Sequence, residues 1–282
     1  MSIGRDLGHG PGTTGVRDRV AFVTGAGQGI GLGIARALAA GGARLALIDI
    51  DAAQLESAAA ELGAVTDVAS FTLDVRDRAA YAAVAGEVEA QLGHVSLLFN
   101  NAGVANGASP RRVTFADWDW VLGVNLQGVV NGIQTFMPTM IERGDGGYIV
   151  NTASGAGLVG LGTDFLYVTS KFAVVGLSES LHVKLAKYGI GVSVLCPGPV
   201  DTNILANSER LRSDQSDRHV RTTDKSDLLK SGVSPDTVGR MVLDAMAAGR
   251  LYIHTDDVME QPIKVRTQLL LDALPSALAS LA

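Results

Sequence analysis

Tyr167 and Lys171, four residues apart, are the two side chains of this sequence best suited to proton transfer. On a helix this spacing places both side chains on one face, one turn apart. A free phenol has a pKa of about 10, and a nearby cation lowers it toward the working range of a base. Ser154, thirteen residues before Tyr167, offers a hydroxyl that could hold a carbonyl or alcohol oxygen. A Tyr–Lys pair at this spacing is commoner on a solvated helix face than in a catalytic site. The residues around it must therefore decide whether the pair is catalytic.

A glycine-rich turn near the N-terminus predicts a site for a dinucleotide. It lies between an apolar strand expected at Val20–Thr24 and a helix expected at Leu32–Ala40. Glycines let backbone N–H groups approach a pyrophosphate, and a helix N-terminus favours negative charge. The alternative is a tight strand-to-helix turn that binds nothing. The residues of this turn expected at the cofactor are Gly25, Gln28, Gly29, Ile30 and Gly31.

The second predicted strand, Arg44–Ile50, carries a carboxylate twenty-four residues after Gly25. A carboxylate at this place, Asp49, can accept hydrogen bonds from the adenosine ribose hydroxyls. It would repel a 2′-phosphate, because two like charges 4 Å apart cost about 1 kcal/mol in water and about 4 at an effective dielectric of 20. Gln28 and Ile50 occupy the two positions where an NADP site usually carries a cation. The sequence therefore favours NAD over NADP.

Two of the acidic residues have a simpler role open to them, that of helix cap. Asp49 could cap the helix expected at Ala52–Leu62, although Asp51 is better placed to do so. Asp74 could lie near the adenine, or it could cap the helix expected at Arg78–Gln91. These two roles of Asp74 are compatible with each other.

Polar or glycine-containing segments follow three further predicted strands. In an open parallel sheet, ligands bind outside the carboxyl ends of the strands, so these segments should share one edge with the glycine turn. A purely structural turn is the alternative for the segment Asn100–Gly103. Asn101, Ala102 and Gly103 follow the strand expected at Val95–Phe99. Ser154 follows the strand expected at Gly147–Asn151. Pro197, Gly198, Val200 and Thr202 follow the strand expected at Ile190–Leu195.

An amide, Asn125, lies inside the apolar series of a long helix expected at Phe115–Glu142. A buried amide must find hydrogen-bond partners. It is either a satisfied core residue or the holder of a water molecule in a proton path. A second notable segment is the very polar stretch from Asn203 to Ser231, just past a strand end, which is typical of a lid over a site.

The domain organisation expected from these elements is simple. The 282 residues suffice for one large α/β domain, residues 18–282, with the lid near 203–231 and a closing helix at Ile263–Leu281. The Gly-rich, polar residues 1–17 are interpreted as a flexible tail without the apolar core of a secretory signal.

Composition excludes several classes of partner. The net charge of −6 argues against nucleic acid, and no apolar run reaches the length of a membrane span. The single cysteine, Cys196, permits no disulfide within the chain and has no histidine or metal partner implied by spacing. We therefore expect a cytoplasmic protein without a metal, acting on a small molecule.

Together these motifs resemble the short-chain dehydrogenase/reductase family, in the family's order and spacing, from Arg19 to Ile253. One departure is Ala153, where many members carry a serine beside the one at position 154. The resemblance implies a single-domain Rossmann fold with a doubly wound sheet of seven parallel strands. It also implies a homo-oligomer, a dimer or tetramer, joined by the helices near Phe115–Glu142 and Asp164–Tyr188.

The resemblance further implies a role for each site residue. Tyr167 would be the general acid or base, and Lys171 would lower its pKa and bind the nicotinamide ribose. Ser154 would hold the substrate oxygen, and Asn125 would position a water that links the lysine to solvent. The remaining expected contacts to NAD come from Asp74, Val75, Val200 and Thr202.

A looser likeness concerns the substrate. The stretches Gly123–Pro138 and Tyr188–Val194 are similar to bacterial enzymes that oxidise benzylic alcohols of lignin-derived aryl ethers. This implies a dehydrogenase of a bulky aryl or polycyclic secondary alcohol, or a reductase of the ketone. The alternatives are a catalytically silent NAD-binding sensor or scaffold and, last, a sugar epimerase of the related extended family.

Overall fold

The computed structural model describes residues 10–12, 15–105, 109–160, 162, 164–212, 227 and 229–275. Its centre is a parallel sheet of seven strands in the order β3-β2-β1-β4-β5-β6-β7, which confirms the predicted doubly wound Rossmann fold. The order reverses between β1 and β4, where such sheets open a crevice. The strands are β1 Val20–Thr24, β2 Arg44–Asp49, β3 Val68–Thr72, β4 Val95–Asn100, β5 Gly147–Thr152, β6 Ile190–Cys196 and β7 Tyr252–His254.

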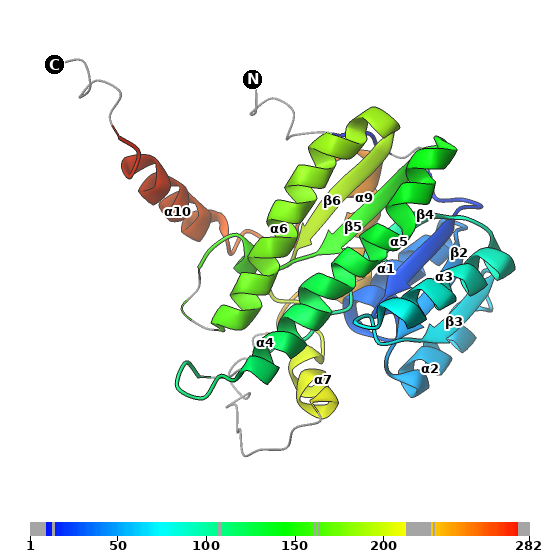
Figure 1. Cartoon of the computed structure of the whole chain (residues 1–282), viewed down its shortest axis with the longest axis horizontal. Helices are drawn as coiled ribbons and strands as arrows, with labels where there is room; N and C mark the ends of the chain where they lie inside the picture. Colours follow the sequence, from blue (N-terminus) through cyan, green and yellow to red (C-terminus); the bar gives the residue numbers. More distant parts are fainter. Residues whose placement is uncertain are drawn as a thin grey trace.

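Helices cover both faces of the sheet, which is why the central strands β1, β4, β5 and β6 are buried along their whole length. Side chains that alternate along β1 enter different cores: Ala21 and Val23 pack with α1, α2 and α9, whereas Val20 and Phe22 pack with α3, α5 and α6. Figure 1 shows the second group of helices in front of the sheet. The helices are α1 Gly29–Ala40, α2 Ala52–Leu62, α9 Pro235–Ala247, α3 Arg78–Leu92, α5 Gly128–Arg143 and α6 Phe165–Leu185.

The long helix predicted at Phe115–Glu142 is not continuous. Helix α4 covers Phe115–Leu122, a π-helical turn η1 covers Gly123–Gln127, and α5 follows. The wider turn carries Asn125, which is fully buried and bonded to residues outside the helix. Apolar periodicity cannot reveal such a turn, because one inserted residue barely disturbs the pattern; π turns often occur at functional sites.

The helix that carries Tyr167 agrees with its predicted bounds. Asp164 caps α6 by accepting the N–H of Tyr167, and a 3₁₀ turn, Ala186–Tyr188, follows the helix. Gly189 ends this segment with a left-handed φ of 69°, a conformation that glycine adopts at no steric cost.

The closing helix is shorter than predicted. Helix α10, Glu260–Asp272, ends three residues before Pro275, and proline disfavours helical geometry in the residue before it. The rest of the predicted range, residues 276–282, lies outside the described residues. Figure 1 shows α10 projecting away from the body, and none of its residues is buried. Within the described residues, no helix combines the length and apolar character needed to cross a bilayer.

Part of the stretch predicted as a flexible tail, residues 1–17, packs on the domain. The Gly10 N–H donates to the Gly249 carbonyl at 2.8 Å, and the side chain of Val16 is buried beside α1. The tail prediction is therefore wrong for the described residues 10–12 and 15–17, because the apolar Val16 enters the core. Residues 1–9 and 13–14 lie outside the described part.

Candidate active site

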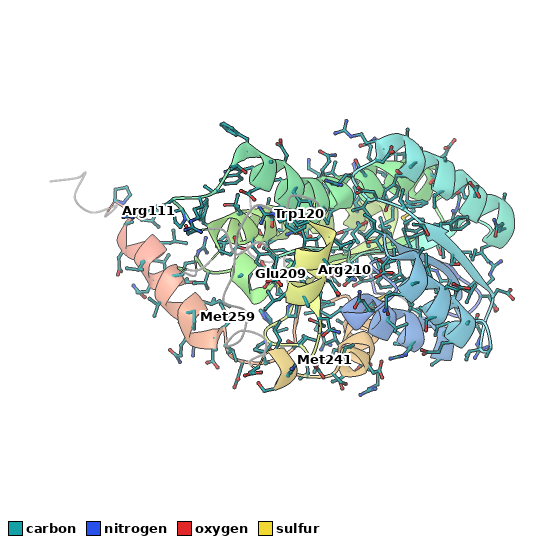
Figure 2. The ribbon with its side chains drawn as sticks, turned by 90° about the horizontal axis from the view of Figure 1, so that it is seen from below. Arg111, Trp120, Glu209, Arg210, Met241 and Met259 are labelled. Carbon is teal, nitrogen blue, oxygen red and sulfur yellow. The ribbon has the colours of Figure 1, made fainter. Side chains whose placement is uncertain are left out.

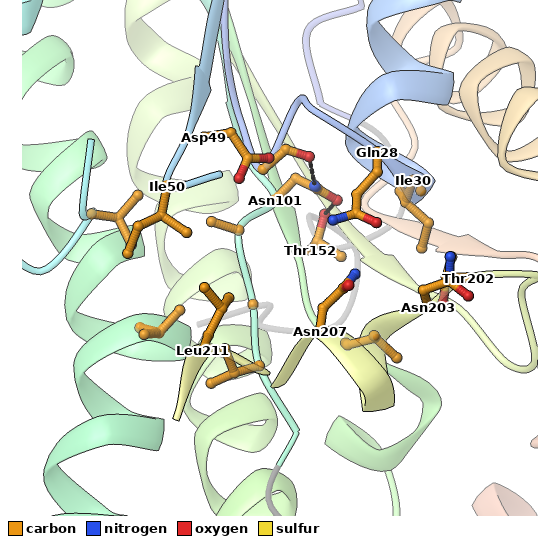
Figure 3. A pocket seen from close by; sticks show the side chains of 18 of the residues that line it. Gln28, Ile30, Asp49, Ile50, Asn101, Thr152, Thr202, Asn203, Asn207 and Leu211 are labelled. Carbon is orange, nitrogen blue, oxygen red and sulfur yellow. Dashed lines mark hydrogen bonds between the residues drawn. The ribbon is translucent and has the colours of Figure 1, made fainter. Parts of the chain in front are cut away.

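A cavity lies at the carboxyl ends of the strands, between the glycine turn and helices α6 and α7, the latter at Ile204–Leu211 (Figure 3). Tertiary structure brings most of the predicted site residues together in its lining. These are Gly25, Gln28, Gly29, Ile30, Asp49, Ile50, Asp74, Val75, Asn101, Ala102, Gly103, Tyr167, Lys171, Pro197 and Thr202.

The glycine turn has the geometry that an anion site requires. Gly25 and Gly29 have φ angles of 66° and 55°, a region unfavourable to other residues. A Cβ at Gly31 would lie 2.0 Å from the Gly25 carbonyl oxygen, so this glycine permits the close packing of α1 on the strand end. The N-cap of α1, Gln28, makes no side-chain cap bond, and the first-turn N–H groups can therefore serve a phosphate.

Asn101 connects the glycine turn to the ends of two other strands. Its Nδ2 donates to the Thr24 carbonyl at 3.1 Å, and the Thr24 hydroxyl accepts the N–H groups of Asn101 and Ala102 at 2.9 and 3.0 Å. The Thr152 hydroxyl donates to Asn101 Oδ1 at 3.3 Å, as the dashed lines in Figure 3 show in part. The turn is thus held in place from β4 and β5.

The carboxylate of Asp49 faces the cavity and is held by backbone groups. Oδ2 accepts the Gly27 N–H at 2.9 Å, and Oδ1 accepts the Asp51 N–H at 3.0 Å. Each oxygen retains a lone pair for a ribose hydroxyl. Asp51 is the cap of α2 and accepts the Gln54 N–H, so the capping alternative for Asp49 is wrong.

The capping alternative for Asp74 is also wrong, because Asp77 caps α3. Asp74 instead binds the guanidinium of Arg76 at 2.6 Å, and both residues line the cavity. Burial raises the pKa of Asp74, but the hydrogen bonds from Arg76 outweigh it and hold that pKa below its ordinary value. A cation therefore lines the cavity at a position that the sequence did not suggest, with its charge balanced by Asp74.

The proton-transfer residues lie together on one side of the cavity. Lys171 Nζ, buried, donates to the Thr152 carbonyl at 2.9 Å and lies 5.5 Å from the centre of the Tyr167 ring. The Ser154 hydroxyl, just past β5, accepts the Ala156 N–H and lies close enough to the Tyr167 phenol to lower the pKa of that group. Helix α6 supplies two of the groups and the end of β5 supplies the third.

Burial controls the titration of this pair. It raises the pKa of Tyr167, against the effect of the Ser154 hydrogen bond, and Asp164 raises it further. It lowers the pKa of Lys171 to about 8. Removal from water is the largest cause of the raised Tyr167 pKa, and the implied lowering of that pKa by Lys171 stays a prediction.

Asn125 is satisfied by three hydrogen bonds. Its Oδ1 accepts the Val104 N–H at 2.8 Å, and its Nδ2 donates to the Val104 carbonyl at 2.9 Å and to the Ser170 hydroxyl at 3.0 Å. This is the satisfied core amide of the first alternative. A Cβ at Gly103 would lie 3.4 Å from Asn125 Oδ1 and 3.5 Å from Lys171 Nζ, so both polar atoms border the same glycine. The water-holding role stays a prediction.

Two residues predicted at the cofactor are turned toward the protein instead. The side chain of Val200 is buried in the core beside α9, so only its backbone could meet a nicotinamide. Gly198 donates its N–H to the Thr255 hydroxyl at 3.0 Å, and a Cβ there would collide with the Asp256 carboxylate at 2.2 Å. These positions shape the loop after β6.

Sequence reasoning missed the contribution of α7. Residues Ile204, Asn207 and Leu211 recur at helical spacing and line the cavity. This spacing was the available signal, but the polar composition of residues 203–231 concealed it. Trp120 and Val124 of the α4–η1 segment were also missed. Most of the predicted lid, residues 213–226 and 228, lies outside the described residues.

Comparisons with known proteins agree with this geometry. Residues 19–212 match the family described as short chain dehydrogenase. The C alpha-dehydrogenase of Sphingobium sp. strain SYK-6 is 35% identical over 266 residues, which cover 92% of this chain and 87% of that protein. The structure of LigO from the same strain is 39% identical with a TM-score of 0.79, covering 92% of this chain and 89% of that one. A short chain dehydrogenase/reductase from Burkholderia phymatum, solved with NAD, is 34% identical with a TM-score of 0.86, covering 94% and 98%.

Proposed function

This chain belongs to the short chain dehydrogenase family, and from that premise we propose that it transfers a hydride between NAD(H) and a secondary alcohol or its ketone. One observation carries the proposal. Tyr167, beside Ser154 and next to Lys171, borders the same cavity as the glycine turn and Asp49. A proton-transfer group and a dinucleotide cradle thus open onto one space.

The residues present fit a nicotinamide dinucleotide. The start of α1, whose N-cap makes no side-chain bond, suits the pyrophosphate. Gly29 lies in the same turn, and a Cβ there would come within 3.3 Å of Thr202. Asp49 suits the adenosine ribose hydroxyls, and the cavity-lining Lys171 suits those of the nicotinamide ribose. When bound, the cofactor supplies or accepts the hydride.

The chain's own groups move the proton. In the oxidation direction Tyr167, as phenolate, takes the hydroxyl proton of the alcohol; in the reduction direction the phenol returns a proton to the carbonyl oxygen. The Ser154 hydroxyl, which lies beside the phenol, can hold the same substrate oxygen. Because burial raises the pKa of Tyr167, the phenolate needs positive charge nearby, and Lys171 and an oxidised nicotinamide ring each carry one.

The proposed preference for NAD rests on the charge of Asp49, which we expect Asp49→Asn and Asp49→Ala to weaken. Loss of repulsion should raise kcat/KM for NADP relative to NAD by about tenfold or more, from the Coulomb cost at short range. Steady-state rates with both cofactors measure the ratio. Asp49→Asn removes the charge and keeps an acceptor for one of the Gly27 and Asp51 N–H groups, whereas Asp49→Ala removes both acceptors, so an effect common to both variants reports the charge more than the loss of acceptors. A wild-type enzyme that prefers NADP would contradict the assignment.

For the substrate we propose a bulky aryl or polycyclic secondary alcohol. Support comes from the C alpha-dehydrogenase, which matches almost the whole chain. NADH fluorescence over a panel of aryl, steroid and aliphatic secondary alcohols tests it. Turnover of aryl alcohols above the others supports the substrate class, and NAD binding without turnover of any panel member would favour the sensor alternative.

We propose that the chain acts as a homo-oligomer. Large apolar side chains are exposed on three neighbouring helical segments: Val130 on α5, Val183 and Tyr188 at the α6 end, and the leucines of α10. Single exposed apolar residues are ordinary, but this group would gain from cover by another copy.

Light scattering at micromolar concentration is expected to give at least twice the mass of one chain. Val183→Glu should shift the mass toward that of one chain, since it places a charge on the expected contact. A wild-type protein that stays monomeric at every concentration would overturn the proposal. Val65→Glu, at an exposed valine distant in sequence from these helices, is the control.

A further inference from the structure

Three consecutive residues at the end of α7 close one end of the cavity. Leu211 lines the cavity, and its neighbours Arg210 and Arg212 are bound to acidic residues of two different elements. Figure 3 shows Leu211 below Ile50 and Asp49, and Asn207 of the same helix below Gln28 and Thr152.

Arg210 reaches the wall that carries the ribose site. Its guanidinium contacts Asp51 Oδ2 at 2.5 Å. The Asp51 side chain is mostly buried, caps α2, and the Asp51 N–H donates to Asp49 Oδ1. The end of α7 is therefore connected, through one residue, to the carboxylate proposed to bind the adenosine ribose.

Arg212 reaches the opposite element, helix α4. It forms an ion pair with Asp117, whose side chain is fully buried and completes a capping box with Thr114. The guanidinium also lies 5.6 Å from the centre of the Trp120 ring, which lines the cavity. A cation packed on an aromatic face and bound to a buried carboxylate is held firmly.

The end that Leu211 closes is the end away from the chemistry. Asp74 and Val75 follow β3, and the strand order places β3 beyond β2, at the edge of the sheet farther from β5 and Ser154. Leu211, Ile50 and Trp120 therefore surround the place where the dinucleotide's adenosine half would lie. The Ser208 hydroxyl accepts the Ala105 N–H at 2.9 Å and gives α7 a third attachment.

We propose that Arg210 and Arg212 are positioning residues that hold Leu211 against the adenosine half of the bound dinucleotide. This clamp, residues 210–212, sets the affinity and residence time of the adenosine moiety, with the two ion pairs as its fixed points. The inference rests on the proposed function, because the ligand is the same NAD. It adds a contact from α7, which lies on the other side of the cavity from the glycine turn.

Calorimetric binding of ADP-ribose to the full chain tests the clamp, because this probe has the adenosine half and no nicotinamide. We expect Arg210→Ala, Leu211→Ala and Asp51→Asn each to weaken binding by about tenfold, the usual order for one lost contact in a closed pocket. Asparagine still caps a helix, so Asp51→Asn removes the ion pair and keeps the cap of α2. Arg210→Lys should recover part of the loss.

A double-variant cycle makes the test specific. If Arg210 acts through Asp51, Asp51→Asn with Arg210→Ala should bind no more weakly than either single variant. Arg111→Ala, which removes an exposed arginine that lies away from α7 in Figure 2, should bind as the wild type does. Stopped-flow release of NADH should accelerate by the same factor in the clamp variants.

Three outcomes would overturn the clamp: unchanged ADP-ribose affinity in Arg210→Ala and Leu211→Ala, losses that multiply in the double variant, or an equal loss in Arg111→Ala. Arg212→Ala leaves the buried Asp117 carboxylate unpaired, so its binding result counts only if this variant still unfolds cooperatively. The variants of Arg210 and Asp51 are sufficient for the test without it. A wild-type chain that binds neither NAD nor ADP-ribose would instead refute the proposed cofactor.

Discussion

Tyr167→Phe is expected to lower the rate of alcohol oxidation by about 10²–10⁴-fold while NAD still binds, since positioned acid–base groups contribute that much. Phenylalanine keeps the half-buried ring and removes only the hydroxyl that lies beside Ser154. Apart from Lys171, which this variant keeps, the other proposed cofactor contacts lie on other elements, so the Kd for NAD should change by less than about threefold. Single-turnover NADH formation and calorimetric NAD titration measure the two quantities.

Tyr81→Phe is the matched control. Tyr81 is fully buried, belongs to the core beside α3, and its hydroxyl has no hydrogen-bond partner among the described residues. The same chemical change there should leave turnover unaltered, and stability nearly so, because no bond is lost. Undiminished turnover in Tyr167→Phe would remove the tyrosine from the proton path.

Lys171→Met is expected to reduce the oxidation rate by about a hundredfold or more, at the lower end of acid–base effects. The lysine charge favours the phenolate, and its loss should displace the rising limb of the pH–rate profile to higher pH. The KM for NAD should also rise, because Lys171 is the proposed ligand of the nicotinamide ribose. Rates at saturating alcohol and varied NAD concentration, from pH 6 to 11, measure the pH–rate profile and the KM for NAD.

Lys187→Met provides the control for this variant. Lys187 lies 4.8 Å from the Tyr188 ring centre, so it is a second lysine beside a tyrosine, but at the exposed end of α6. Its removal should leave both the rate and the pH profile unchanged. If Lys171→Met kept the wild-type profile and lost only NAD affinity, the lysine would be a cofactor ligand and would not act on the phenol.

The same lysine should make stability depend on pH. Burial lowers the folded-state pKa of Lys171 from 10.5 to about 8, so between these values the unfolded chain binds more protons than the folded one. The free energy of unfolding should therefore rise with pH across this window, by at most about 1.4 kcal/mol per unit. Lys171→Met should lack this contribution, and urea unfolding of both proteins at pH 7 to 10 measures the difference. Equal slopes would show that the amine is solvated in the folded protein.

Much of the fold could be read from local sequence. The apolar strands that alternate with helices specify a parallel sheet, because each strand must be covered on both faces. The positive φ angles of Gly25 and Gly29 agree with a turn that glycine was needed to form. The spacing of Tyr167 and Lys171 predicted one helix face, and α6 carries both residues toward the cavity.

Other features depend on contacts between residues distant in the chain. Arg76 lines the cavity with its charge bound by Asp74, and Asn125 depends on Val104 and Ser170 for its partners. That the side chain of Val200 faces the core could not be inferred from the position of this residue after a strand.

By itself the sequence determined the alternation of strands and helices, the glycine turn and the choice of candidate proton-transfer residues. These follow from steric and periodic constraints that act over a few neighbouring residues. Only the tertiary structure decided that α7 closes the cavity through Arg210 and Arg212, and that the pKa of Tyr167 moves upward. Burial and pairing of charges depend on what the fold brings alongside each group, and no local pattern records that.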